Sequence, residues 1–338
     1  MDQTKNDFLG GIHYFRGIAI LLIVSSHLLY ADLESNFYFF TSAVYLNSTI
    51  FYVFISGYLF QHLAYKFDYK KYLKRKWLNV MLPYLIVSIP ALTLRWYSGP
   101  SYLALQSWPD IGESNAWCQL AFYLATGSHL LPLWYLPMIA IFFVLGPIFK
   151  LWDDSPRMYW LLPLLLVVSL LFPRNLENMN DIPRMFVHFA SIYVLGMWYS
   201  RNLEMVRQWV SKYIVVVSLG LLVLFVFCLY EFPWRHQFIF VQKVVAIPVL
   251  MHFLDRIKGS FWKDLCSRLA ETSFGIYFIH FYVILGVRVI MNRILHSEYP
   301  RFWYEWLIEW GVVVIISYVF VMIVKMIFKN KSRYLIGS

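Results

Sequence analysis

Apolar runs of about 20 residues recur along the chain, and short stretches rich in lysine and arginine separate them. A run of that length can cross the hydrocarbon core of a bilayer as a helix. Segment 117–127 is too short to cross, so we expect it to be re-entrant or to lie in the interface. The pattern predicts an all-α polytopic bundle of about ten transmembrane helices, at roughly 8–30, 42–64, 78–97, 132–152, 159–173, 184–200, 213–231, 236–254, 270–291 and 306–328.

The composition agrees with this pattern. Hydrophobic residues make up 60% of the 338 residues and charged residues only 14%, and the mean hydropathy is +0.58. A soluble domain is closer to half apolar and a quarter charged. We therefore expect one membrane-embedded domain over 1–338, with no room for a sizeable soluble domain. We also expect the first apolar run to be a retained helix, since His13 and Arg16 interrupt it.

The positive charges are distributed unevenly between alternate loops. If the N-terminus lies inside, the inner segments hold 21 of the 29 lysines and arginines and the outer segments hold 6. Cytoplasmic loops are enriched in these residues, so both termini are expected in the cytoplasm. The same asymmetry explains the net charge of +10, so membrane lipids are the expected partners and a nucleic acid is not. The three cysteines lack metal-ligand spacing, and no metal site is expected.

Two ionisable residues in the first apolar run are the best indication of function. Arg16 and His27 are eleven residues apart, which is about three helical turns, so they share one helix face about 16 Å apart. Arginine suits phosphate groups, and histidine is the commonest general base. One interpretation is that Arg16 binds a phosphate-bearing cytosolic donor and His27 acts on a deeper group. The alternative is that Arg16 reaches lipid phosphates and His27 bonds a neighbouring helix.

Other segments carry candidate residues whose roles the sequence leaves open. The basic loop 66–77 includes Arg75 and Lys76, which either bind an anionic donor or anchor the loop by the positive-inside rule. Ser56 and Gly57 permit close helix approach. Residues Ser273, Tyr277 and His280 form one polar stripe, which either lines a cavity or ties helices together. Lys243 lies inside an apolar run, where it snorkels or pairs.

No P-loop, HExxH, GxSxG or C-x-x-C motif occurs in the sequence. ATP-driven transport, metalloprotease chemistry and nucleophile-elbow serine chemistry therefore have no support.

Five motifs in order resemble the acyltransferase-3 family of integral membrane acyltransferases. They are FRGIAILLIVSSHL (15–28), FYVFISGYLF (51–60), KRKWLNVMLPY (74–84), LPLWYLPM (131–138) and TSFGIYFIHF (272–281). Two positions depart from the family pattern. His13 stands where an aspartate is common, and Asn79 stands where a second arginine is common.

The resemblance implies a bundle of about ten helices that transfers an acyl group to a glycan hydroxyl. The acyl donor is usually acetyl-CoA. By resemblance, His27 matches the catalytic histidine and Arg16 the essential arginine, and Arg75 and Lys76 are candidates for holding the CoA phosphates. Candidate cavity or substrate residues are His13, Ser56, Trp134, Tyr135, Ser273, Tyr277 and His280.

The sequence therefore predicts a multi-pass acyltransferase of a bacterial inner membrane. Its co-substrate is acetyl-CoA or another acyl-CoA, and its acceptor is a cell-surface, lipid-linked or exported glycan. His27 would be the general base. The main alternative is a transporter or glycan-export subunit without acyl transfer chemistry, and a lipid-modifying enzyme is the third. Should His27 prove structural, the base would be sought among His13, His129 and His280.

The charge asymmetry predicts that the N-terminus, the 66–77 loop and the C-terminus all face the cytoplasm. Single cysteines can be introduced into a variant that lacks the three native ones, and labelled from each side of intact cells. We expect Lys70→Cys to react only after the membrane is made permeable. Labelling of that cysteine from outside would contradict the topology and the cytosolic position of the donor.

Overall fold

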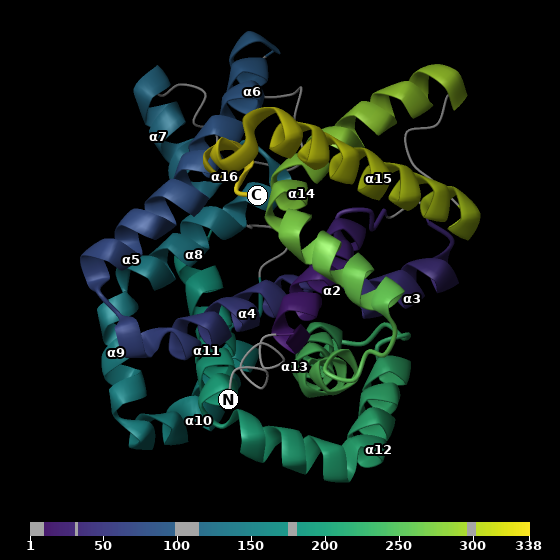
Figure 1. The fold of residues 1–338 in the computed structure, drawn as a ribbon. Coiled ribbons are helices and arrows are strands. Elements are labelled where there is room, and N and C mark those ends of the chain that lie inside the picture. The colour runs from purple at the N-terminus through teal and green to yellow at the C-terminus, as the bar shows by residue number, and fades with distance from the viewer. Residues whose placement is uncertain (1–9, 31–32, 99–114, 175–180, 296–301) are drawn as a thin grey trace. The chain divides into compact units, whose positions relative to one another are not determined.

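The computed structural model describes residues 10–30, 33–98, 115–174, 181–295 and 302–338, and this part of the chain is helical without any strand (Figure 1). It divides into two compact units. Residues 1–63 and 192–322 form unit 1, and residues 64–191 and 323–338 form unit 2. The all-helical class predicted from the sequence is confirmed. The single membrane domain stays a prediction.

Unit 1 is organised around its first helix. Its main helices are α2 (Gly10–Ser26), α3 (Ser35–Tyr45), α4 (Thr49–His62), the second half of α11 (Ile182–Arg201), α12 (Leu203–Phe227), α13 (Arg235–Leu254), α14 (Ser260–Leu295) and most of α15 (Trp303–Phe328). Helix α2 packs along α14 and also contacts α3, α4 and α13 (Figure 1). Neighbouring helices therefore cover α2 on several sides, which explains how this apolar helix can hold ionisable residues.

The segment expected as one span at 42–64 is broken into α3 and α4. Asn47 has a φ of 64° between them, a left-handed conformation that asparagine tolerates better than most residues. The break leaves carbonyl groups at the end of α3 without helical partners. Lys243 of α13 donates hydrogen bonds to the carbonyls of Ala43 (2.7 Å) and Val44 (2.8 Å). The buried lysine thus caps the end of α3. Of the two roles expected for Lys243, pairing is the one observed, and its partners are main-chain oxygens.

Two glycines allow α4 and α11 to meet backbone to backbone. A Cβ placed on Gly57 would collide with the main-chain oxygen of Tyr193, and one on Gly196 would collide with that of Phe54. Small residues at helix contacts in membranes allow such approach. The packing role expected for the Ser56–Gly57 pair is therefore confirmed for Gly57.

Unit 2 is built from shorter helices. They are α5 (Tyr69–Lys76), a π-helical turn η2 (Trp77–Met81), α6 (Leu82–Ser98), α7 (Ala116–Thr126), η3 (Leu131–Trp134), α8 (Tyr135–Val144), α9 (Gly146–Asp154), η4 (Pro156–Leu161), α10 (Leu162–Leu171), the first half of α11, and α16 (Ser332–Ile336).

Local sequence sets several of these boundaries in unit 2. The Asp68 carboxylate accepts the backbone N–H of Lys71 (3.1 Å) and caps α5. Asn115 caps α7 in the same way, and Gly127 ends α7 in the left-handed conformation at φ 72°. Prolines begin α9, α10, η3 and η4, where the missing N–H costs nothing.

The number of spans differs from the sequence prediction. Six helical segments of the described chain are long and apolar enough to cross a membrane, and two bent pairs raise the number to eight. The pairs are α7 with the 131–144 helix, bent by 73°, and α9 with the 156–171 segment, bent by 106°. The spans expected at 132–152 and 159–173 thus fall on parts of these bent pairs. The total of about ten stays a prediction, as does the orientation of the termini.

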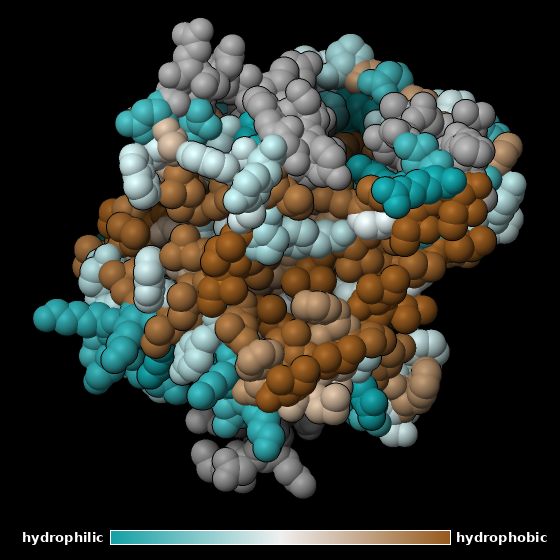
Figure 2. Space-filling model, turned by 90° about the horizontal axis from the view of Figure 1, so that it is seen from above, coloured by the Kyte–Doolittle hydropathy of each residue, from teal (hydrophilic) through white to brown (hydrophobic). Residues whose placement is uncertain are grey.

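The surface explains why the chain needs a bilayer. Figure 2 shows hydrophobic side chains over a wide part of the viewed face. In unit 1, α12 and α15 expose many large apolar residues, among them Val215, Leu219, Ile308 and Ile315. Patches of that kind do not persist on soluble monomers. Lipid chains would cover them.

The close contact of α4 with α11 predicts the effect of a minimal substitution. An alanine normally stabilises a helix by about 1 kcal/mol relative to glycine. Gly57→Ala should instead lower the free energy of unfolding by about 1–3 kcal/mol, because the new methyl group meets backbone that must shift. Thermal unfolding in detergent measures the effect.

The matched control is Gly220→Ala in the exposed helix α12, where a Cβ would have no atom within 4 Å. This variant should be as stable as the parent or more stable. Equal stability of Gly57→Ala and Gly220→Ala would contradict the close contact.

Candidate active site

Gly17, next to Arg16 on α2, allows α2 and α14 to pack closely together. A Cβ on Gly17 would lie 2.6 Å from the carbonyl oxygen of Cys266 and 3.1 Å from the nitrogen of Ala270. Only a residue without a side chain permits this approach. Arg16 therefore reaches the main chain of α14 directly.

Arg16 is held by one carbonyl of α14. Its Nε donates a hydrogen bond to the Ala270 oxygen (2.9 Å), and its Nη2 donates to the same oxygen. The Ser273 hydroxyl also donates to that oxygen, at 2.8 Å. A guanidinium has five N–H donors, so two of them fix its position. Arg16 thus fastens α2 to α14, which is a structural role beside any role in binding.

His13 lies one turn before Arg16 on the same face. Its Nε2 is 3.1 Å from the Ser267 hydroxyl of α14. This polar contact gives His13 a partner on α14.

His27 lies just beyond the end of α2. The helix ends at Ser26 rather than at the expected Tyr30, and His27 occupies a turn in which its N–H donates to the Val24 carbonyl (3.1 Å). Its ring lies 5.2 Å from that of His280 and 5.9 Å from that of Phe281, both on α14. The expectation of His27 inside a helix is wrong. The expectation that Arg16 and His27 face the same way is confirmed, since both contact α14.

The His280 ring, which lies beside His27, has one nitrogen fixed by a hydrogen bond. Its Nδ1 is 3.0 Å from the Ile276 carbonyl, which can only accept, so Nδ1 carries a proton. Its Nε2 is buried and has no hydrogen-bond partner among the described residues. In the neutral ring, Nε2 is therefore an unprotonated nitrogen close to His27.

The remaining stripe residues are buried against α4. Tyr277 has its ring 6.1 Å from that of His280 and 6.2 Å from that of Tyr52. The Tyr52 hydroxyl donates to the Ser273 carbonyl (3.4 Å). Ser273 and Tyr277 therefore tie α14 to α4, as one of the two interpretations expected. His280, at the other end of the stripe, lies beside His27. Ser56 is half-buried on α4, one turn after Tyr52.

Two residues of α15 fasten the chain that follows His27. The Trp306 indole N–H donates to the Leu28 carbonyl (2.9 Å). The Tyr30 hydroxyl donates to a carboxylate oxygen of Glu309 (2.9 Å), and the Arg288 guanidinium lies 4.9 Å from the centroid of the Tyr30 ring. Glu309 is buried. These contacts hold the turn that carries His27.

Sequence reasoning missed Trp306 and Glu309. A signal for Glu309 was available, because an acidic residue within an apolar run is rare and is usually functional. Trp306 carried no such signal, since indole side chains are common at the ends of membrane spans.

The predicted residues of unit 2 have packing partners of their own. Arg75 is exposed on α5, whereas the Lys76 ammonium lies 4.5 Å from the centroid of the Phe143 ring. Trp134 stacks on Phe189 at 5.9 Å. Tyr135 is buried beside Trp134. These contacts show a core role for Trp134 and a cation–π contact for Lys76.

The structure thus gathers one part of the predicted site. Unit 1 brings together His13, Arg16, His27, Ser273, Tyr277 and His280 along α14. Arg75, Lys76, Trp134 and Tyr135 belong to unit 2. In the described part of the chain, no group of three or more histidine, cysteine, aspartate or glutamate side chains could hold a metal ion.

The comparison with protein families decides the classification. The acyltransferase-3 family (Acyl_transf_3), described as an acyltransferase domain, matches residues 9–326. The chain belongs to this family. A comparison with curated proteins found no match, and a comparison with solved structures found none either. The resemblance inferred from the five motifs is confirmed, and family and helices together indicate a multi-pass membrane acyltransferase.

Proposed function

We propose that this acyltransferase moves an acyl group, acetyl in the first instance, from cytosolic acyl-CoA to a hydroxyl of a glycan. The observation that carries the proposal is the arrangement of Arg16 and His27 along α14. Arg16 bonds at Ala270, and the His27 ring lies tilted against that of His280. These points are ten residues apart on one helix, or about 15 Å. An extended pantetheine arm spans a comparable distance.

Arg16 is the proposed donor-binding residue at one end of this path. A guanidinium binds phosphate oxygens through paired N–H groups. The bonds to Ala270 leave the guanidinium fixed in place before any donor arrives, which lowers the entropy lost on binding. Arg75 and Lys76 of unit 2 stay candidates for the CoA phosphates on the family resemblance alone, and the Arg75 side chain is exposed.

His27 is the proposed general base at the other end. It takes the proton of the acceptor hydroxyl while the hydroxyl oxygen attacks the thioester carbonyl carbon. The new C–O bond forms, the C–S bond breaks, and the CoA thiolate leaves and takes up the proton. His27 is half-buried at the end of a helix, so an acceptor can approach it.

His280 is the reserve candidate for the base. Its unprotonated Nε2 lies beside His27. Two other histidines have weaker claims, since His13 Nε2 contacts Ser267 and both ring nitrogens of His129 have partners, the Tyr123 carbonyl (3.0 Å) and the Ser88 hydroxyl (2.7 Å). The transporter alternative is weakened by the family, whose members are acyltransferases.

Substitution of His27 tests the chemistry. Purified full-length protein is given acetyl-CoA labelled in the acetyl group, with and without a glycan acceptor, and release or transfer of the label is followed. His27→Gln keeps a hydrogen-bonding side chain but cannot take the proton, so the rate should fall by about 10²–10⁴. CoA affinity should stay within about twofold, because a base acts only on the reacting end.

His252→Gln is the matched control, since His252 is a half-buried histidine of unit 1 whose ring packs on Phe253. It should transfer label at the parental rate. If His27→Gln is equally active, His27 is structural and His280→Gln becomes the decisive variant. An intact thioester in every arm would contradict the enzyme assignment.

Substitution of Arg16 tests donor binding separately. Arg16→Lys keeps the charge and loses the fork, so CoA affinity should fall by about tenfold or more. Because Arg16 also bonds to Ala270, thermal stability should fall somewhat. Ser273→Ala serves as the control, since it removes another donor to the same carbonyl without removing a cation. CoA binding by Arg16→Lys that is as tight as binding by the parent protein would show that Arg16 is only structural.

A further inference from the structure

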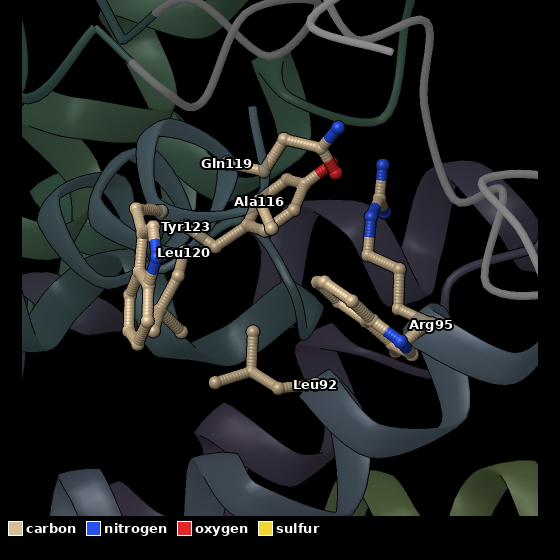
Figure 3. Close-up of a pocket in the computed structure, with 8 residues that line it drawn as sticks. Leu92, Arg95, Ala116, Gln119, Leu120 and Tyr123 are labelled. Carbon is tan, nitrogen blue, oxygen red and sulfur yellow. The ribbon is translucent and has the colours of Figure 1, made fainter. Parts of the chain in front are cut away.

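A pocket of unit 2 lies between the last turns of α6 and the first turns of α7. Its volume is about 210 Å³. It is lined by Leu92, Arg95, Trp96, Ala116, Trp117, Gln119, Leu120 and Tyr123. Figure 3 shows the polar ends of Arg95, Gln119 and Tyr123 near one another, with Leu92 at the opposite side. The pocket therefore has a polar end and an apolar end.

Among the described residues that line this pocket, Arg95 is the only charged one. The residue is only 9% exposed, and its guanidinium carbon lies 4.2 Å from the centroid of the Tyr123 ring. Among the described residues, this guanidinium makes no ion pair and no hydrogen bond, and its contact is the one with the Tyr123 ring. Stacking on an aromatic face fixes a guanidinium but satisfies none of its five N–H groups. A buried cation in this state favours an anion.

Helix α7 adds to the positive potential at the same place. Ala116 is its first residue, so the pocket borders the N-terminal turn of an 11-residue helix. Asn115 already accepts the N–H groups of Trp117 and Cys118. The helix dipole remains, and it favours negative charge near this end.

The rim indicates that the anion belongs to a lipid. Trp96 is 67% exposed and Trp117 is 77% exposed, and indoles of this kind collect at the level of lipid headgroups. Helix α6 ends here, at the boundary of the apolar segment 69–97. The neighbouring Ile89 and Leu94 are also exposed on α6. A soluble anion has no apolar part that could pack against the apolar end of the pocket.

We propose that this pocket binds the phosphate of an anionic membrane lipid, with the guanidinium of Arg95 on the phosphate oxygens and the adjoining acyl or prenyl chain against Leu92 and Leu120. The headgroup of a phospholipid and that of a polyprenyl phosphate share this chemistry. The site is separate from the residues proposed for acyl transfer, and its test does not depend on them.

Native mass spectrometry of the full-length protein in detergent tests the proposal with defined lipids. The protein is mixed with phosphatidylglycerol, with phosphatidylcholine of the same chains, with a polyprenyl phosphate, or with inorganic phosphate alone. We expect retention of both anionic lipids in preference to phosphatidylcholine. Phosphate alone should not displace them, because it lacks the apolar part.

Arg95→Gln is the decisive variant, and Arg157→Gln is its control, since Arg157 is an exposed arginine of the same unit. Arg95→Gln should lower retention of the anionic lipids by about tenfold or more, whereas Arg157→Gln should stay within about twofold. Comparing the retention of phosphatidylglycerol with that of the polyprenyl phosphate shows which of the two lipids binds more tightly.

Two results would overturn the proposal. One is equal retention of anionic lipid by Arg95→Gln and Arg157→Gln, even if Arg95→Gln melts at a lower temperature. That pattern would make the contact of Arg95 with Tyr123 purely structural. The other is complete displacement of the lipids by inorganic phosphate, which would make the site a soluble-anion site.

Discussion

The bond between Arg16 and the Ala270 carbonyl is the interaction on which the arrangement of unit 1 depends. A guanidinium cannot lose its charge, and in an apolar bundle it must have hydrogen-bond partners. The chain provides one by bringing α2 against α14 through Gly17. The same contact aligns α2 so that the turn after its end presents His27 to His280. The structural role of Arg16 and its proposed role in donor binding therefore depend on the same position of the side chain.

Buried cations elsewhere in unit 1 follow the same rule. Lys243 bonds to carbonyls at the end of α3, and the Arg235 side chain donates to the Cys228 carbonyl (3.0 Å) and to the Ser42 hydroxyl. Main-chain oxygens at helix ends are unpaired and carry the negative end of the helix dipole. A break in a membrane helix thus creates the acceptors that a buried lysine or arginine needs. In unit 1 such helix ends occur after α3 and after α12.

The turn that carries His27 is held from two sides. A tilted contact with the His280 ring positions the His27 ring, while Trp306 and Glu309 fasten the two residues Leu28 and Tyr30. A general base needs a defined position relative to the proton it takes. Contacts from α14 and α15 fix the position of His27, the proposed base, although it lies outside a regular helix. Sequence reasoning had placed His27 in a rigid helix, and the structure achieves a similar constraint through tertiary contacts.

The sequence by itself determined the all-helical class, the family and the shared direction of Arg16 and His27. The class follows from local periodicity and composition, which act within one segment and need no knowledge of neighbours. The shared direction follows from the eleven-residue spacing, and the family follows from the resemblance of five motifs in order. Tertiary structure decided where helices break, which residues hold the turn at His27 and where Lys243 finds its acceptors. Long apolar runs look alike whether a helix is straight or bent, as the bent segments of 116–171 illustrate. Partners such as Ala270 and Glu309 lie more than 250 residues from the side chains that they bind, and no local pattern records such a pairing.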